Sequence, residues 1–220
     1  MYSSQRALSL SKVESGEPAA AADWIRILSS YRDPSVVRST FELIVTAVPF
    51  VALWLVIWAA WQFGYGWLAF ILAVPAAAFL VRLFLIQHDC GHGAFFKNRA
   101  LNDWTGRVIG VLTLTPYDMW KRAHAIHHGT SGNLDKRGVG DLDTLTVREY
   151  RALPFWGRMR YRLYRNPIVL FGIGPIYMFV LRHRLPLGMT ILNWRAWISP
   201  MTTNAAIAAV VVGMMWLIGW

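Results

Sequence analysis

The sequence has little cysteine, few acidic residues and long stretches with no charge at all. Cys90 is the one cysteine among 220 residues, which excludes an internal disulfide and fits a reducing compartment. Acidic residues number 12 against 22 lysines and arginines, so the formal net charge is +10. No internal repeat, low-complexity tract or cleavable signal peptide is recognisable. The distribution of charged residues along the chain says more about the fold than the net charge does.

Charge is missing from three long apolar runs. Leu43–Phe63 and Met201–Trp220 carry none, and Trp67–Ile86 carries only Arg82. About 20 apolar residues, at about 1.5 Å of rise each, cross a bilayer core of about 30 Å. The sequence therefore predicts an all-α integral membrane protein with three transmembrane helices, over residues 43–63, 67–86 and 201–220. Buried helices of a soluble protein are the alternative.

The basic excess lies on one side of the predicted spans. Residues 87–200 carry 16 lysines and arginines against 7 acidic residues, and residues 1–42 carry 5 of each. Because cytoplasmic segments of membrane proteins are enriched in Lys and Arg, we expect both regions in the cytoplasm. The charge then reflects orientation and attraction to anionic membrane lipids. No nucleic-acid motif accompanies it, so we expect no nucleic-acid partner.

The segments between the spans predict loops and interfacial helices. Residues 1–42 are expected to be a cytoplasmic lead, and the apolar run Val108–Tyr117 is too short to cross a bilayer, so it is expected to be interfacial or re-entrant. Residues 129–147, rich in Gly and Asp, indicate an ordered loop. The arginine-rich residues 158–165 and the apolar run Pro167–Leu181, which arginines flank, predict interfacial helices.

Five of the six histidines gather in two clusters, HDCGH and HAIHH. His88 and His92 are spaced i and i+4, which on a helix places two imidazoles about one turn apart on one face. His124 and His128 repeat that spacing. His127 lies about 100° around the axis from His128, so it can reach the same metal ion from the side or a neighbouring one.

A group of five imidazoles suits first-row transition metals, whereas calcium and magnesium favour oxygen ligands. We therefore predict that all five clustered histidines are metal ligands. Asp89, Asp135 and Asp141 are candidates to accept the second N–H of a ligand histidine; Asp89 is equally a candidate for a solvated charge. Asp143 is expected to cap a turn or face water.

Four residues near the clusters have a structural interpretation. His183, isolated between two arginines, is expected to be an interfacial or hydrogen-bonded side chain. Cys90 is expected to fill space rather than to bind metal. Gly91 and Gly93 are expected to let helices approach closely.

The stretches HDCGHGAFF and KRAHAIHHGTSGNLDKRGVGD resemble the membrane-bound fatty acid desaturases, especially the bacterial acyl-lipid type, from about residue 40 to the end. The resemblance implies helical hairpins in a membrane, here a bacterial inner membrane, with histidine boxes facing the cytoplasm. It maps His88 and His92 to the first box, and His124, His127 and His128 to the second.

The resemblance also implies a chemistry. It implies a di-iron centre of two Fe ions, with no catalytic residue beyond the metal ligands, and an oxidoreductase that uses O2 to introduce a double bond into an acyl chain. The substrate would be a fatty acyl lipid held in an apolar tunnel. No electron-transfer domain is visible in the sequence, so a separate electron donor of the ferredoxin or cytochrome type is implied.

The sequence departs from the family in one respect. The family's third box, another H-x-x-H-H after a fourth span, has no counterpart here. We interpret residues 43–220 as an incomplete desaturase domain, truncated before the third box. We expect the 220-residue form to be inactive, because metal affinity depends on a complete ligand set.

The sequence is also compatible with two other functions. A related membrane hydroxylase with histidine boxes would make an alcohol instead of an alkene. A non-catalytic membrane fragment that binds zinc, or no metal, is the second; the absent third box is its main support.

Overall fold

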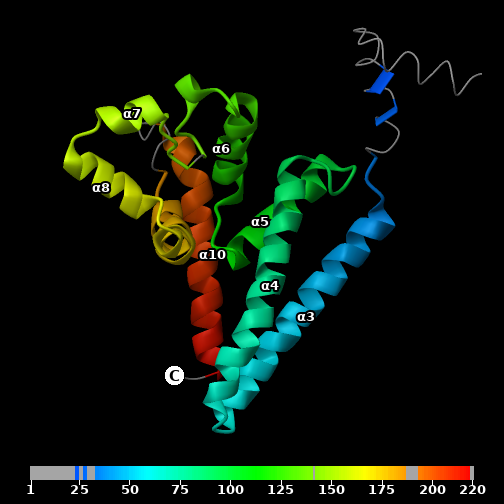
Figure 1. Ribbon diagram of the computed structural model, residues 1–220. Helices are drawn as coiled ribbons and strands as arrows, with labels where there is room; N and C mark the ends of the chain where they lie inside the picture. Colours follow the sequence, from blue (N-terminus) through cyan, green and yellow to red (C-terminus); the bar gives the residue numbers. More distant parts are fainter. Residues whose placement is uncertain (1–22, 25–26, 29–32, 141, 187–192, 219–220) are drawn as a thin grey trace, which may run out of the picture.

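The structure is a computed structural model that describes residues 23–24, 27–28, 33–140, 142–186 and 193–218. Every regular element within those ranges is a helix (Figure 1). The α-helices of six residues or more are α3 (Val36–Gln62), α4 (Gly66–Gly91), α5 (Arg99–Leu112), α6 (Tyr117–Thr130), α7 (Val147–Ala152), α8 (Phe155–Tyr164) and α10 (Trp194–Ile218). Short helical turns complete the described chain: η1 (Leu134–Lys136), η2 (Val169–Ile173), α9 (Gly174–Ile176), η3 (Tyr177–Leu181) and η4 (Arg182–Arg184).

Among the described residues, α3, α4 and α10 are each long and apolar enough to cross a membrane, which confirms the prediction of three spans. Each helix extends beyond its predicted apolar run. The first begins at Val36, the second continues to Gly91, and the third begins at Trp194. Hydropathy underestimates these lengths because a helix continues wherever its backbone hydrogen bonds are satisfied. Residues 219–220 of the third predicted span lie outside the described residues, as does most of the predicted lead 1–42.

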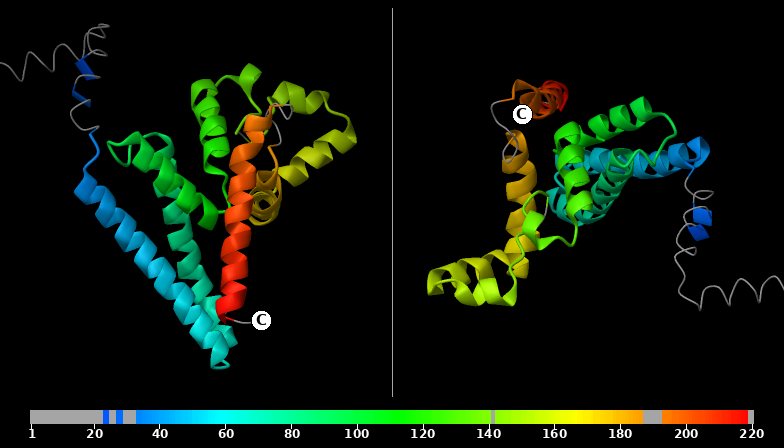
Figure 2. Two further views of the ribbon diagram at one scale, coloured as in Figure 1. Left: turned by 180° about the vertical axis from the view of Figure 1, so that it is seen from behind. Right: turned by 90° about the horizontal axis from the view of Figure 1, so that it is seen from above.

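The helices α3 and α4 form a hairpin that opens from a tight turn (Figures 1 and 2). Gly64 makes the turn with φ +80°, a conformation that glycine adopts without strain. At the other end, the Ser35 side chain accepts from the backbone N–H of Arg38 and so caps α3. Arg82 and Glu42 form an ion pair between the two helices. Glu42 therefore offsets the charge of Arg82, which lies within the second predicted span.

The helices α5 and α6 lie between this hairpin and α10 (Figure 1). Tyr117, the first residue of α6, is fully buried on α5, and a β-carbon at Gly106 would overlap its ring. Arg107 donates to both carboxylate oxygens of Asp118, at 2.9 and 3.0 Å. The predicted interfacial run Val108–Tyr117 is therefore not one element, because it ends α5, makes a turn and begins α6.

The last span is tied to this turn and to α6 by polar contacts. Met119 donates its backbone N–H to Ser199 of α10 at 3.2 Å. Arg184 donates to Asn204 of α10 at 2.8 Å and also to the carbonyl of Leu114, which has φ +55°. These contacts place α6 against α10 through side chains that the hydropathy pattern does not reveal.

In the described part of the loop after α6, Arg137 donates to the carbonyl of Thr144 at 2.9 Å, in agreement with the predicted ordered loop. Thr146 and Glu149 form a capping box at the start of α7, and Arg137 pairs with the same glutamate. The arginine-rich segment forms α8, as predicted, and the segment Val169–Arg184 follows it at a bend of 58°. If the two pieces are taken as one bent element, they are long and apolar enough to be a fourth span. If they are taken separately, neither is long enough to cross a membrane. Figure 2 shows the second piece lying across the direction of α10.

Candidate metal centre

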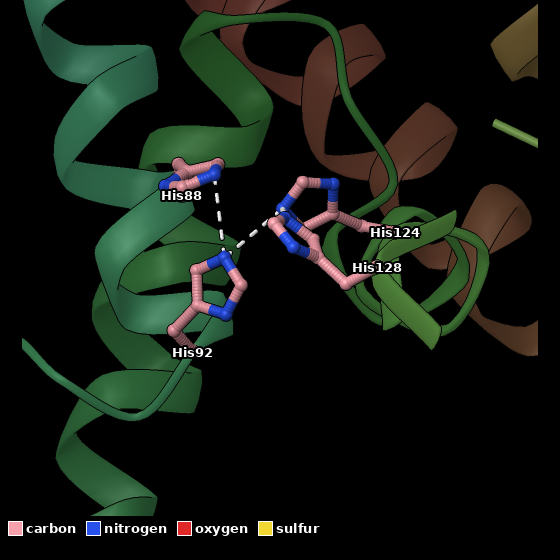
Figure 3. Close-up of side chains that lie close together, drawn as sticks. All are labelled: His88, His92, His124 and His128. Atoms are coloured by element: carbon pink, nitrogen blue, oxygen red, sulfur yellow. Dashed lines mark hydrogen bonds between the residues drawn. The ribbon is translucent and has the colours of Figure 1, made fainter. Parts of the chain in front are cut away.

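Four imidazoles from two helices point at one another on the side of the structure away from the hairpin turn (Figure 3). Nε2 of His88 lies 3.3 Å from Nε2 of His92. The same atom of His92 lies 3.1 Å from Nε2 of His124, which lies 3.1 Å from Nε2 of His128. One ligand atom from each of the four lies within 4.8 Å of the others. We call this group the four-histidine cluster.

The separations fit ligation of a transition metal. Imidazole nitrogens bind such an ion at about 2.0–2.1 Å, so two of them at a tetrahedral angle lie roughly 3.3 Å apart. The three successive separations in the cluster, 3.1 to 3.3 Å, have this size. A donor set made only of imidazole nitrogens suits iron, zinc, copper or nickel and disfavours calcium and magnesium. The residues present therefore fit a metal ion, and their geometry alone does not select iron.

The electrostatics of the cluster favour the neutral imidazoles that metal binding needs. Burial, followed by the charges of the neighbouring histidines, lowers the pKa of His124 from 6.5 to about 4. Burial and the proximity of His88 and His128 also lower the pKa of His92. A protonated imidazole has no lone pair for a metal, so a lowered pKa keeps both ligands available near neutral pH.

The first pair of histidines comes from the last turn of a membrane helix. His88 lies within α4, and His92 follows as its C-terminal cap residue, with its backbone N–H donating to the carbonyl of His88 at 3.1 Å. Both histidines follow the apolar run that ends at Ile86, so the position of the membrane span determines how far they lie from the membrane core. This placement agrees with the predicted i, i+4 geometry on one helix face.

The second pair comes from α6, a helix of a different kind. Its 14 residues include few large apolar side chains, and Pro116, before its first residue, offers no side-chain cap. His124 and His128 lie on one face, as predicted from their spacing. His127 lies outside the four-histidine cluster, with its ring 6.0 Å from that of His124 and 5.5 Å from that of His128, measured between centroids.

The predicted carboxylate partners lie in different places. Asp89 places Oδ1 3.3 Å from Nδ1 of His88, on the ring edge opposite the cluster, although its side chain is 57% exposed. Asp135 lies in η1 and is exposed. Asp141 lies outside the described residues. Asp143 donates its backbone N–H to Tyr164 at 3.1 Å and is exposed, in agreement with the prediction.

Residues given a structural role in the sequence analysis agree with it in part. Cys90 is fully buried in the core and Gly91 allows a close approach, both as predicted. Gly93 was predicted wrongly, because it has open space around it and makes a turn with φ +69°. His183 is 9% exposed and lies against Phe179, with 5.3 Å between ring centroids, so it is more buried than an interfacial side chain. Its hydrogen bond with the backbone of Leu114 agrees with the other interpretation, that of a hydrogen-bonded side chain.

Trp120 belongs to the site, although the sequence patterns did not single it out. Its ring stacks on that of His124, with 4.6 Å between centroids and 14° between planes. It also packs against Gly91, where a β-carbon would lie 2.9 Å from the indole. The spacing of four residues before His124 places Trp120 on the same helix face. The sequence therefore contained the spacing that places Trp120 beside His124. It did not contain the contact of Trp120 with α4.

Comparison with known proteins places this geometry in a family. The model of the family described as "Fatty acid desaturase" matches residues 65–220. A fatty acid desaturase of Bacillus subtilis is 40% identical over 193 residues, which cover 88% of this chain and 54% of that protein. The chain thus spans about half the length of this curated relative. No solved structure matches the chain.

Two further relatives match over shorter stretches. An sn-1 acyl-lipid omega-3 desaturase (ferredoxin) of Synechocystis is 36% identical over 98 residues, 44% of this chain and 25% of that protein. An omega-3 fatty acid desaturase of the endoplasmic reticulum from Vigna radiata is 35% identical over 104 residues, 47% of this chain and 25% of that protein. The family match covers both histidine-bearing helices and the third apolar helix. The chain belongs to the fatty acid desaturase family.

Proposed function

We propose that this protein is part of a membrane enzyme that introduces a double bond into the acyl chain of a lipid, using dioxygen and a pair of iron ions. The observation that carries the proposal is the convergence of four Nε2 atoms from α4 and α6, successive ones 3.1 to 3.3 Å apart, beside a helix apolar enough to span a membrane. Membership of the desaturase family supplies the reaction class.

Iron is proposed from the family and from the donor set together. His88, His92, His124 and His128 would hold one ion, and His127, on the same helix as the second pair, is the donor that this chain offers to a second. When bound, the iron pair supplies the activation of dioxygen and the oxidising power that removes two hydrogens from adjacent methylenes. The overall balance is one acyl chain, O2, two electrons and two protons giving one alkene and two waters.

The residues of this chain contribute orientation and charge control. The helix pair holds imidazole rings toward a common point, and the lowered pKa of His124 keeps its ring neutral and available as a ligand. Asp89 accepts from Nδ1 of His88 when that nitrogen carries the proton, which directs Nε2 toward the cluster. The protein thus fixes geometry while the metal performs the oxidation.

The membrane setting and the electron donor follow from charge and from the relatives. The basic excess of residues 87–200 supports a cytoplasmic position for the histidines, in a bacterial inner membrane. A relative named as an acyl-lipid desaturase with ferredoxin supports a fatty acyl lipid as substrate and a separate ferredoxin-type donor. The wide apolar surface of α3, α4 and α10 supports contact with membrane lipids.

The test is expression of the gene at its natural length in a bacterium that lacks desaturases, with a ferredoxin-type donor supplied. We expect new unsaturated acyl chains in the membrane lipids, measured by gas chromatography with mass spectrometry. The variants H124A and H128A should make none, while W104L, which alters an exposed residue of α5, should retain activity. Hydroxylated acyl chains would assign a hydroxylase instead. Unsaturation that survives H124A would contradict the proposal.

A further inference from the structure

Trp120 lies where the two histidine-bearing helices meet. It belongs to α6, is half-buried, and packs against the buried core cluster, to which α4 contributes Leu83, Ile86 and Cys90. We propose that Trp120 is a positioning residue of the four-histidine cluster, seated on Gly91 so that its indole holds the imidazole of His124 in the ligating orientation. This inference rests on the proposed metal-binding function and adds a residue that ligates nothing.

Trp120 stacks on His124, the histidine that links the pair from α4 to the pair from α6. His124 is the imidazole whose Nε2 lies 3.1 Å from both a nitrogen of α4, on His92, and a nitrogen of α6, on His128. Rotation of this one ring would therefore separate the two pairs. Trp120 lies parallel to it, at 4.6 Å and 14°, so its indole covers one face of the imidazole and opposes that rotation.

The seat of the indole is built into α4. A β-carbon at Gly91 would lie 2.9 Å from the six-membered ring of Trp120, which is closer than carbon atoms approach without displacement. On the same helix, Phe84 meets the indole edge-on, at 5.5 Å and 70°. The glycine thus removes the one atom that would exclude the indole, and the phenylalanine limits its movement.

An ordinary packing role for Trp120 makes a different prediction. A residue that only fills space can be replaced by another apolar side chain with a loss of stability and little change in the metal. A positioning residue needs a flat ring parallel to the imidazole. Its loss should therefore change the affinity and the geometry of the bound ion, and a smaller aromatic ring should restore part of both.

The experiment titrates cobalt(II) into the purified protein and its variants in detergent, with visible absorption reporting coordination geometry. We expect W120L to bind about 10-fold more weakly, the lower end of the range for residues that orient metal ligands, with an altered spectrum. W120F should recover most of the affinity. The matched control is W104L, because Trp104 lies on α5 and is 64% exposed.

A second pair of variants tests the seat. G91A should weaken cobalt binding by displacing the indole, whereas G129A should not, because a β-carbon at Gly129 meets nothing within 4 Å. In the double variant G91A/W120F the shorter ring leaves room for the new methyl group. We therefore expect that variant to bind as well as W120F alone.

The outcomes separate this inference from the proposed function. Unchanged affinity and spectrum in W120L, or a G91A defect that persists unaltered in the W120F background, would overturn the positioning role. If the unaltered protein binds no cobalt, the metal-binding proposal fails and the positioning role fails with it. If the unaltered protein binds cobalt and W120L binds it equally well with the same spectrum, only the positioning role fails.

Discussion

The two helices that carry the histidines reach the same point by different means. The helix α4 is a 26-residue span, and its histidines are fixed by continuation of a helix that the membrane itself favours. The helix α6 has 14 residues and only two buried ones, Tyr117 and Met119. Its position comes from contacts with α5, α4 and α10. One half of the metal site is thus placed by secondary structure and the other by tertiary packing.

This difference predicts where the site is vulnerable. Changes in α4 should act strongly on the metal only where they alter a ligand or the seat of Trp120. Changes in the contacts around α6 should act on the metal from a distance, because they move a whole helix. The following substitutions test this contrast.

The largest effect is expected from removing the histidine that joins the two pairs. H124A deletes the ring whose Nε2 lies 3.1 Å from those of His92 and His128. We expect metal affinity to fall by more than about 100-fold, beyond the usual effect of an orienting residue. H127A should have a smaller effect, because that ring lies outside the four-histidine cluster. Isothermal titration with cobalt(II) measures both, and equal losses would contradict the assignment.

Acid should release the metal over a defined range. Burial and the neighbouring histidines lower the pKa of His124 from 6.5 to about 4, so the assembled site favours the neutral ring. Above about pH 7 the ring is neutral in both folded and unfolded chains, and pH should have little effect. As the pH falls from 6.5 to 4, the unfolded chain binds the proton more readily, and both stability and metal retention should decrease. Metal content after dialysis at each pH measures this; retention at pH 4 would contradict it.

A substitution on α5 tests whether α6 depends on tertiary packing. A β-carbon at Gly106 would overlap the ring of Tyr117 at the start of α6, so G106A should destabilise the protein by about 1–3 kcal/mol and weaken metal binding. The control is G213A, since α10 has open space at that glycine. Thermal unfolding and cobalt titration of both variants make the comparison. If G106A is measurably destabilised but keeps its full metal affinity, metal binding does not depend on the packing of α6 against α5.

A milder change removes the contact between α10 and α6. S199A deletes the hydroxyl that accepts from the backbone N–H of Met119 at 3.2 Å. This hydroxyl acts as the N-terminal cap of α6, because Pro116 provides no side-chain cap. Loss of a helix cap costs about 1 kcal/mol, and we expect a small decrease in metal affinity with it. S199T, which keeps a hydroxyl, should recover the stability. If S199A unfolds at the same denaturant concentration as the unaltered protein, the hydroxyl does not hold α6.

The smallest effect is expected on the α4 side. D89N removes the charge that lies 3.3 Å from Nδ1 of His88, but this carboxylate is more than half exposed and solvent screens it. We expect metal affinity to change by less than about 10-fold, because α4 itself already directs the ring. A loss as large as that of H124A would show that α4 does not place its histidine unaided.

The sequence alone predicted the part of the site that secondary structure determines. Hydropathy predicted the α4 span, and the i, i+4 spacing predicted that His88 and His92 share a face. Hydropathy did not show that α4 extends to Gly91, because helix continuation depends on backbone bonds rather than on apolar side chains. The histidine spacing pointed to that extension. The contact of Trp120 with α4 was out of reach, since it joins residues 29 positions apart through the packing of two helices.

The prediction for α6 was similarly partial. The spacing of His124 and His128 indicated one helix face, but the apolar run Val108–Tyr117 suggested a single interfacial or re-entrant piece. The structure divides that run because Tyr117 turns onto Gly106 and Leu114 takes a positive φ. A hydropathy pattern records how apolar a segment is, and it does not record where the chain turns.

The most direct test of the central claim is X-ray absorption spectroscopy of the protein loaded with iron(II). If α4 and α6 supply one site, the spectrum should show nitrogen ligands at about 2.0–2.2 Å with the scattering pattern of imidazole. That pattern should be lost in the double variant H92A/H124A, which removes one ligand from each side. An unchanged spectrum in the double variant, or ligands that are not imidazole in the unaltered protein, would contradict the account.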